Sequence, residues 1–370
     1  MTDQVKESFG DTVSSTSGVT PAGNQVDHSP NRRLRLVIGG SDSARVVFPG
    51  ITVIALVYGH PEYVDEALDS VVALNCDRWE LLIADNGSAE DTYSKVKVWL
   101  NQHSPDERIH YVRRDRNIGL FPNLNRAIQE ASTDWVVIFC TDDRLDPDAI
   151  ETLESVHDHF PDARLIISTF EQMDALGGRL PASHAANHDT ISPATTQLSS
   201  AAFISALLRV GSVAGNLTGV AFSRDLWIEA GGFREDWLHA ADWEWILRAS
   251  ELSPVALNRK PIATVRTHSK QESGINRQRR VDLPEAAEVV RRLREHPSLA
   301  DEPLRNEWAA HLMQYHLWTL LKDLTKGEAG SLRDGLRQID QAAGLPRTSL
   351  EMVRWLPQRI RVRRATRTLK

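Results

Sequence analysis

Two adjacent carboxylates, Asp142 and Asp143, directly follow an apolar run over residues 135–139. The run predicts a buried strand, and two acids at the end of such a strand repel each other unless a cation or a donor network neutralises them. Hard divalent cations bound by one or two carboxylates and substrate phosphates are a common reason for this arrangement. The alternative is a solvated turn before a helix that Asp146-Pro147 opens.

Polar residues also follow two other apolar runs. Residues 51–57 end at Val57 and lead into Tyr58, and residues 81–84 close on Asp85. Near-continuous apolar strands that alternate with amphipathic helices predict an α/β fold, with a doubly wound, mostly parallel sheet and helices on both faces. Ligands on such sheets bind outside the carboxyl ends of the strands. We therefore expect these residues and the acid pair to converge on one site.

The remaining pattern extends this alternation along the chain. It predicts helices over residues 63–74, 91–100, 120–131, 148–160 and 242–252, and strands over residues 109–112, 165–167, 218–222 and 261–267. Residues 171–200 are polar and are predicted to form a loop-rich excursion. After about residue 283 the pattern becomes helical throughout.

Composition supports a three-part organisation. The 370 residues include 41% hydrophobic and 25% charged residues, with a net charge of −7; these values are ordinary for a soluble protein and give no reason to expect nucleic-acid binding. Residues 1–48 are predicted to be a disordered segment, because they contain few large apolar residues. A catalytic α/β domain is predicted over 49–275, and a helical region with a basic tail over 276–370.

Cysteine usage and the missing targeting signals predict a cytoplasmic protein. The two cysteines are Cys76 and Cys140, and Cys140 ends a predicted buried strand. A disulfide framework is therefore not expected. No run approaches the length of a membrane-spanning helix, and the N-terminus lacks the basic and apolar segments of a secretory signal.

Short motifs occur in a recognisable order along residues 50–270. They are Leu56-Val57-Tyr58-Gly59, Asp85-Asn86-Gly87-Ser88-Ala89-Glu90-Asp91-Thr92, Asn117-Ile118-Gly119, Thr141-Asp142-Asp143-Arg144-Leu145-Asp146-Pro147, Gly231-Gly232-Phe233 with Ala241-Asp242 and Arg248, and Arg266-Thr267-His268. In this order they resemble the motifs of family 2 glycosyltransferases, which have the GT-A fold. The resemblance implies an inverting, metal-dependent transfer of a sugar from a nucleotide-sugar donor, of UDP or dTDP type, to a hydroxyl acceptor in surface glycan assembly.

The resemblance also implies roles for individual residues. Asp143, with Asp142 nearby, is expected to hold Mn²⁺ or Mg²⁺, with His268 as a further metal or diphosphate contact. Asp242 is the expected general base that deprotonates the acceptor hydroxyl. The residues expected to bind the nucleotide are Val57, Tyr58, Asp85, Asn117, Gly119 and Asp142, and those expected to stack on the acceptor sugar are Trp237 and Trp243.

Several of these roles have a structural alternative. Asp85 is also suited to capping the Asn86-Gly87 turn, and Asp242 to capping the helix that follows it, with Glu244 as a rival base. His268 is also compatible with a solvated position after a strand. For Trp237 and Trp243, packing in the core is the alternative to sugar binding.

Three positions depart from the family pattern. Cys140 stands where many members have the first aspartate of the metal motif, Ala241 replaces a glutamate, and Leu124 replaces an arginine near the donor phosphates. These departures leave open a catalytically silent binding or scaffold protein with the same fold. A nucleotidyltransferase is a third hypothesis, but Tyr58-Gly59 opens no glycine-rich, basic loop that would grip a triphosphate.

The C-terminal tail suggests a further contact. Residues 359–370 contain six basic side chains, which suit an anionic membrane surface where lipid-linked acceptors are found. A solvated, frayed tail is the alternative. For the helices before the tail, the sequence leaves three roles open: packing on the catalytic domain, shaping the acceptor cleft, or forming a homodimer.

Overall fold

The computed structural model describes residues 50–181, 188–326 and 332–368, with backbone only for residues 358–368. These residues belong to one compact unit that spans residues 46–370. The segment predicted to be disordered, residues 1–48, lies outside the described residues. No helix in the described ranges combines the length and the apolar character that crossing a bilayer requires.

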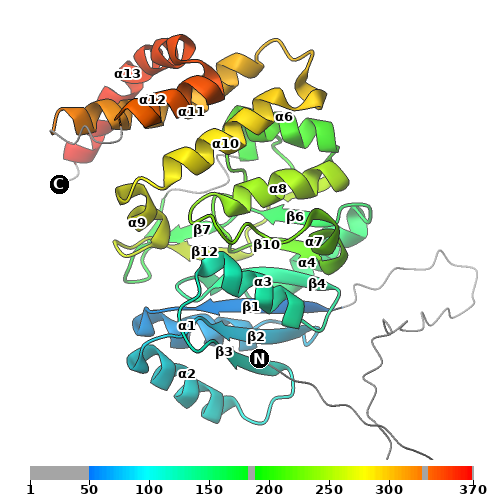
Figure 1. Cartoon of the computed structure of the whole chain (residues 1–370). Helices are drawn as coiled ribbons and strands as arrows, with labels where there is room; N and C mark the ends of the chain where they lie inside the picture. The colour runs from blue at the N-terminus through cyan, green and yellow to red at the C-terminus, as the bar shows by residue number, and fades with distance from the viewer. Residues whose placement is uncertain (1–49, 182–187, 327–331, 369–370) are drawn as a thin grey trace, which may run out of the picture. The chain divides into compact units, whose positions relative to one another are not determined.

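An eight-stranded, mostly parallel sheet forms the centre of this unit (Figure 1). Its strands are β1 (Ile51–Val57), β2 (Trp79–Asp85), β3 (Ile109–Arg113), β4 (Trp135–Cys140), β6 (Leu165–Ser168), β9 (Thr196–Leu198), β10 (Val220–Ser223) and β11 (Val255–Asn258). They lie in the order β3-β2-β1-β4-β10-β6-β11-β9. Strands β1 to β4 are parallel, as are β6 and β11, whereas β10 and β9 run antiparallel to their neighbours. The predicted doubly wound α/β fold is confirmed.

Helices cover both faces of this sheet, which explains why its central strands β1 and β4 are almost entirely apolar. Val53 and Ala55 of β1 pack into the cluster with α1 (Pro61–Val72), α2 (Glu90–His103) and α4 (Ala149–His159). Ile54 and Leu56 face the opposite cluster, to which the helices α3 (Leu120–Glu130), α6 (Ser200–Val210) and α8 (Ala241–Leu252) contribute. Successive residues of one strand thus contribute to two separate cores.

A second, four-stranded sheet joins distant segments in the order β5-β12-β7-β8. Its strands are β5 (Arg144–Leu145), β7 (Glu171–Met173), β8 (Arg179–Leu180) and β12 (Ala263–Arg266). Because β12 pairs with β5, the end of β12 lies beside the turn that follows β4. This pairing brings Arg266 and His268 to the acid pair.

The helical region packs on the same core as the larger sheet. Its elements are α9 (Glu272–Gln278), α10 (Asp282–Glu295), the 3₁₀ turn η1 (Pro297–Leu299), α11 (Arg305–Leu324), α12 (Leu332–Ala343) and α13 (Leu345–Thr368). Val289 and Leu293 of α10, and Met313 of α11, are buried in the cluster that contains the apolar residues of α6 and α8. Helices α11, α12 and α13 pack against one another, and α10 contacts both α8 and α12 (Figure 1).

The prediction of a loop-rich excursion over residues 171–200 is wrong in part. Strands β7, β8 and β9 lie within this range. The longest of them has three residues, too few for a periodic pattern, and they pair with distant partners: β7 with β12, and β9 with β11. The sequence pattern also did not predict strand β11, helix α9 or helix α6.

Candidate active site

The strand order reverses between β1 and β4, the point at which doubly wound sheets bind ligands. Val57 lies opposite Asp85 in the register of β1 and β2, and Leu56 lies opposite Cys140 in the register of β1 and β4. The carboxyl ends of three strands therefore meet at one edge, as predicted from their polar residues.

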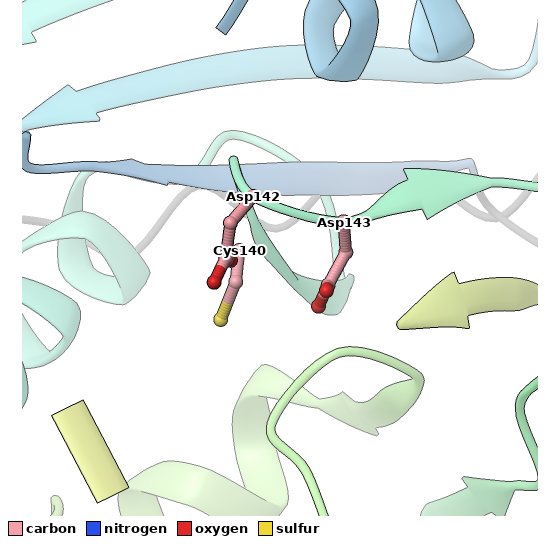
Figure 2. Close-up of side chains that lie close together, drawn as sticks. All are labelled: Cys140, Asp142 and Asp143. Atoms are coloured by element: carbon pink, nitrogen blue, oxygen red, sulfur yellow. The ribbon is translucent and has the colours of Figure 1, made fainter. Parts of the chain in front are cut away.

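The acid pair sits on a tight turn after β4. The Thr141 hydroxyl donates to the carbonyl oxygen of Leu56 at 2.9 Å, and the Asp143 amide donates to the carbonyl oxygen of Cys140 at 3.0 Å. Figure 2 shows the side chains of Cys140 and Asp142 side by side, with Asp143 set apart. The thiol sulfur and one oxygen of each carboxylate lie within 4.8 Å of one another.

Asp143 faces inward and is already hydrogen-bonded. Its side chain is 1% exposed, Oδ2 accepts from the Thr218 hydroxyl at 2.6 Å, and Oδ1 accepts from the Arg266 amide at 2.8 Å. Burial, and then the neighbouring Asp142 carboxylate, raise the pKa of Asp143 well above its usual value. Asp143 therefore fixes the turn to β12 in this structure.

Asp142 occupies the accessible side of the turn and meets His268. Its Oδ2 lies 3.0 Å from Nε2 of His268, whose side chain is only 5% exposed. The Lys270 amide donates to Nδ1 of the same ring at 3.3 Å, so the neutral imidazole carries its proton on Nε2 and donates it to Asp142. Arg266 reinforces the turn through Nε, which donates to the carbonyl oxygen of Asp142 at 2.8 Å.

Asp85 is fully buried among its own partners. One carboxylate oxygen accepts from the Ser88 amide at 2.7 Å, and the other accepts from the Tyr111 hydroxyl at 2.8 Å and lies 3.3 Å from Nε of Arg113. Burial, with help from Asp85, raises the pKa of Tyr111. The structure thus gives Asp85 the turn-capping role, and contact with a nucleotide base stays a prediction.

Asn86 holds together the loop that contains Asn117 and Gly119. Its Nδ2 donates to Oδ1 of Asn117 at 3.0 Å and to the carbonyl oxygen of Gly119 at 3.1 Å, and its Oδ1 accepts from the Ile118 amide at 3.0 Å. The Asn86 amide also donates to the carbonyl oxygen of Val57 at 2.9 Å. Two of the predicted nucleotide residues, Asn117 and Gly119, are therefore joined by a side chain to which the sequence prediction gave no role.

Tyr58 extends from this edge into solvent. Its side chain is 53% exposed, whereas Val57 is 1% exposed and presents only backbone to the edge. An exposed aromatic ring beside buried strand ends is free to stack on a planar ligand.

Gly87 allows the close approach of two chain segments at this edge. Its φ is +69°, and a Cβ atom there would overlap the backbone of Arg116 and lie 2.8 Å from the Asn117 nitrogen. We expect Gly87→Ala to lower the free energy of unfolding by at least about 2 kcal/mol in urea titration, because strain and backbone overlap act together.

Gly59→Ala is the matched control for that substitution. Gly59 has a similar φ of +68°, but no neighbouring atom lies within 4 Å of the place that an added Cβ would take. Only backbone strain therefore remains, at about 1 kcal/mol. Equal losses from both substitutions would contradict the importance of the close approach.

A cavity of about 440 Å³ joins several predicted site residues. Asp142 and Cys140 line one part of it, Asp242 and Trp243 line another, and His316 of α11 contributes from the helical region. Asp85 and Asp143 are buried and do not line it. The structure thus brings Asp142, rather than Asp143, together with Asp242.

Asp242 lies in the first turn of α8, and its carboxylate bonds the local backbone. Its Oδ1 accepts from the Trp243 amide at 2.8 Å. Burial raises the pKa of Asp242 to about 6, the range suited to a general base near neutral pH. Glu244, the rival base, is 2% exposed and lies 2.8 Å from the guanidinium groups of both Arg248 and Arg292, so its carboxylate is already engaged in two ion pairs.

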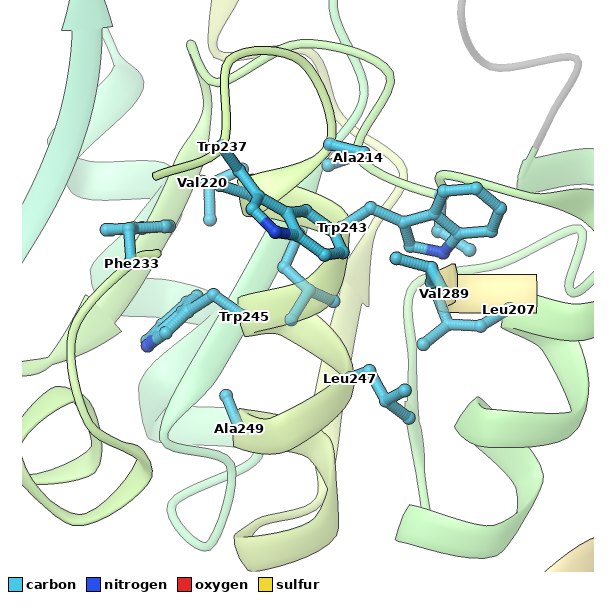
Figure 3. Close-up of a cluster of buried hydrophobic side chains, with 14 of the residues drawn as sticks. Leu207, Ala214, Val220, Phe233, Trp237, Trp243, Trp245, Leu247, Ala249 and Val289 are labelled. Carbon is cyan, nitrogen blue, oxygen red and sulfur yellow. The ribbon is translucent and has the colours of Figure 1, made fainter. Parts of the chain in front are cut away.

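The tryptophans belong mainly to the core. Figure 3 shows Trp237, Trp243 and Trp245 in a cluster of buried apolar side chains. Trp237 is 8% exposed and carries the Arg234 guanidinium 4.8 Å from its ring. Trp243 is equally buried but lines the cavity, so it is the better placed of the two for acceptor contact.

Two departures from the family pattern are also core positions. Leu124 and Ala241 are completely buried in the hydrophobic cluster. Cys140, in contrast, lines the cavity, and burial together with Asp142 and Asp143 raises the pKa of its thiol. Of the three departures, only Cys140 changes the chemistry of the cavity wall.

The sequence of the chain is similar to those of known glycosyltransferases. Residues 52–193 match the family described as "Glycosyl transferase family 2". The chain is 27% identical to the abequosyltransferase RfbV of Salmonella typhimurium over 174 residues, which are 46% of this chain and 51% of RfbV. It is 28% identical to the putative teichuronic acid biosynthesis glycosyltransferase TuaG of Bacillus subtilis, over 28% of this chain and 40% of TuaG.

The fold is similar to that of S. aureus TarS residues 1–349, solved in complex with UDP-GlcNAc. The TM-score is 0.58 at 15% identity, over 80% of this chain and 81% of that one. This likeness shows the fold alone. The chain spans between 14% and 51% of the length of the curated relatives that it matches.

Proposed function

Since this chain is a member of glycosyl transferase family 2 through residues 52–193, we propose that it transfers a sugar from a nucleotide-diphosphate sugar to a hydroxyl acceptor in cell-surface glycan assembly. The observation that carries the proposal is the shared cavity: Asp142 and Asp242 line one hollow of about 440 Å³ beside the switch point of the sheet. The relatives RfbV and TuaG, by their names, support a glycan pathway.

The donor side of the cavity is the edge where β1, β2 and β4 end. We place the nucleotide there, with Tyr58 free to stack on the base and the loop around Asn117 and Gly119 held ready by Asn86. A uracil or thymine base is the expected match, and Asp85 reaches it only if Tyr111 and Arg113 release its carboxylate.

The donor set suits a divalent cation. Asp142 offers a carboxylate, His268 offers Nε2 once its proton is displaced, and Cys140 offers a sulfur nearby. Mn²⁺ and Mg²⁺ prefer carboxylate ligands, and Mn²⁺ tolerates nitrogen better. When bound, the cation neutralises charge on the departing diphosphate. The expected ligand Asp143 keeps a supporting role here, because its oxygens already accept two hydrogen bonds.

Asp242 performs the proton transfer in this proposal. The acceptor hydroxyl approaches the anomeric carbon from the side opposite the diphosphate and loses its proton to the Asp242 carboxylate as it attacks. Attack opposite the leaving group inverts the anomeric centre. Trp243, which lines the same hollow, offers an apolar face to the acceptor sugar.

A lipid-linked acceptor remains part of the proposal, with the basic tail as its membrane contact. The side chains of residues 358–370 lie outside the described part of the structure, so the support here is their charge alone. A homodimer through the helical region likewise stays a prediction.

A thermal-shift screen tests the donor side directly. We expect UDP or dTDP with Mn²⁺ to stabilise the protein by roughly 2.7 kcal/mol at a hundredfold excess over the dissociation constant. Chelation of the metal with EDTA should remove most of that gain.

Donor hydrolysis separates an enzyme from a silent scaffold. Without its acceptor, an active transferase slowly transfers the sugar to water and so releases nucleoside diphosphate. Stabilisation by a nucleotide without any release, across UDP-, dTDP- and GDP-sugars with Mn²⁺ or Mg²⁺, would support the scaffold instead.

A further inference from the structure

The loop that leads into Asp242 is held by one carboxylate from the helical region. Glu285 of α10 accepts three backbone hydrogen bonds: from the Leu238 amide at 2.8 Å, the His239 amide at 2.8 Å and the Ala240 amide at 2.7 Å. Glu285 is 9% exposed. Three short, charge-assisted bonds to consecutive amides fix the path of this loop.

A second side chain holds the same loop from α9. Nδ2 of Asn276, a residue that is 2% exposed, donates to the carbonyl oxygen of Leu238 at 2.7 Å. The loop is therefore held through its backbone amides, which donate to Glu285, and through a backbone carbonyl, which accepts from Asn276. Leu238, His239 and Ala240 also line the cavity, so the segment held by these hydrogen bonds is part of the cavity wall.

The position of the loop matters because α8 has no cap of its own. Its N-cap residue is Ala240, which has no side chain to accept a hydrogen bond, although a side-chain oxygen usually serves helix starts in this way. Asp242 is the second residue of α8, and its carboxylate accepts from the adjacent Trp243 amide. The direction in which the Asp242 carboxylate points therefore depends on the backbone that Glu285 holds.

Two other acids of α10, Glu288 and Glu295, behave differently. Glu288 pairs with Arg291 and Arg292, and Glu295 pairs with Arg291, all near the surface. Glu285 instead turns its charge toward backbone amides next to the cavity. This difference marks it as more than a surface charge.

We infer that Glu285 is a positioning residue for Asp242, so that the helical region forms part of the catalytic apparatus rather than an appendage. The inference rests on the proposed function, because that function makes Asp242 the general base whose position Glu285 fixes. It extends that function by making the geometry of the base depend on α10. Misplacement of a catalytic group by about 1 Å can cost about 10²-fold in rate.

Glu285→Gln tests the inference with little change in side-chain shape. An amide presents one acceptor oxygen and turns an NH₂ group toward backbone donors, so at least one of the three bonds is lost. We expect kcat for transfer or donor hydrolysis to fall at least about tenfold. The dissociation constant for UDP with Mn²⁺ should change less than about twofold, because the three hydrogen bonds of Glu285 go to residues 238–240 and not to the ends of β1, β2 or β4.

Hydrogen exchange gives the readout that general destabilisation would not produce. Amide exchange at residues 238–240 should accelerate at least about tenfold in Glu285→Gln, whereas exchange in β1 and β4 should stay unchanged. Glu295→Gln, on the exposed end of the same helix, is the matched control and should leave kcat and exchange at wild-type values.

Several outcomes would overturn the inference. These are a Glu285→Gln protein with wild-type kcat, unchanged exchange at residues 238–240, or equal losses of kcat and nucleotide affinity. If Glu285→Gln does not fold, Glu285→Asp, which withdraws the charge by one methylene, must lower kcat, and full activity would refute the inference. If wild type and Glu295→Gln also lack activity, the proposed function fails. The exchange experiment still tests whether Glu285 holds the backbone of residues 238–240 in place.

Discussion

Asp242→Asn is expected to lower kcat for sugar transfer by about 10²–10⁴-fold at pH 7.5, the range found when a general base is removed. Asparagine preserves the size of the side chain and can accept the hydrogen bond from the Trp243 amide, so the fold and the binding of donor nucleotide should survive. The measurement is steady-state transfer together with the dissociation constant for UDP and Mn²⁺.

The pH profile of the wild type provides the second half of this test. Burial raises the pKa of Asp242 to about 6, and only the ionised form can take a proton. Activity should therefore be at its plateau above about pH 7, halve near pH 6 and fall to roughly a tenth at pH 5. The acidic limb should vanish from the residual activity of Asp242→Asn.

Glu244→Gln is the informative comparison, because Glu244 lies two residues away but is already paired with Arg248 and Arg292. If Asp242 is the base, Glu244→Gln affects stability more than the shape of the pH profile. A loss of the acidic limb in Glu244→Gln, with Asp242→Asn still active, would move the base role to Glu244.

The sheet was predictable because its signals are local. Residues 51–57 and 135–139 are apolar apart from Thr52, and their strands were predicted to within a residue because both of their faces are covered. The edge where these strands end followed from the parallel topology alone. Short strands such as β7 and β9 were not predictable, because their pairing with β12 and β11 depends on residues more than 50 positions away.

The site was predictable by residue type but not by orientation. The sequence places Asp142 and Asp143 together, but only the pairing of β12 with β5 decides which of them turns inward to the Arg266 amide. Glu285 carried no signal, because an acid on an amphipathic helix is normally solvated. Its role becomes visible only once α10 packs beside the start of α8.

The inward turn of Asp143 leads to a second large expected effect. Asp142→Asn should lower metal-dependent transfer by about 10²–10³-fold, because it removes the carboxylate that lines the cavity and faces His268. It should also weaken Mn²⁺ binding, measured by electron paramagnetic resonance in the presence of UDP. A direct binding measurement separates loss of the metal from loss of chemistry.

Asp143→Asn is the discriminating partner in this experiment. Asp143 is buried, and burial raises the pKa of its carboxyl group. Asparagine keeps the size of this side chain, and its oxygen can still accept from the Arg266 amide. We expect Asp143→Asn to retain Mn²⁺ affinity within about threefold and to act mainly on stability, through the weakened bond to the Thr218 hydroxyl. If Asp143→Asn abolishes Mn²⁺ binding while Asp142→Asn retains it, Asp143 is the metal ligand after all. The turn would then have to rotate when the donor binds.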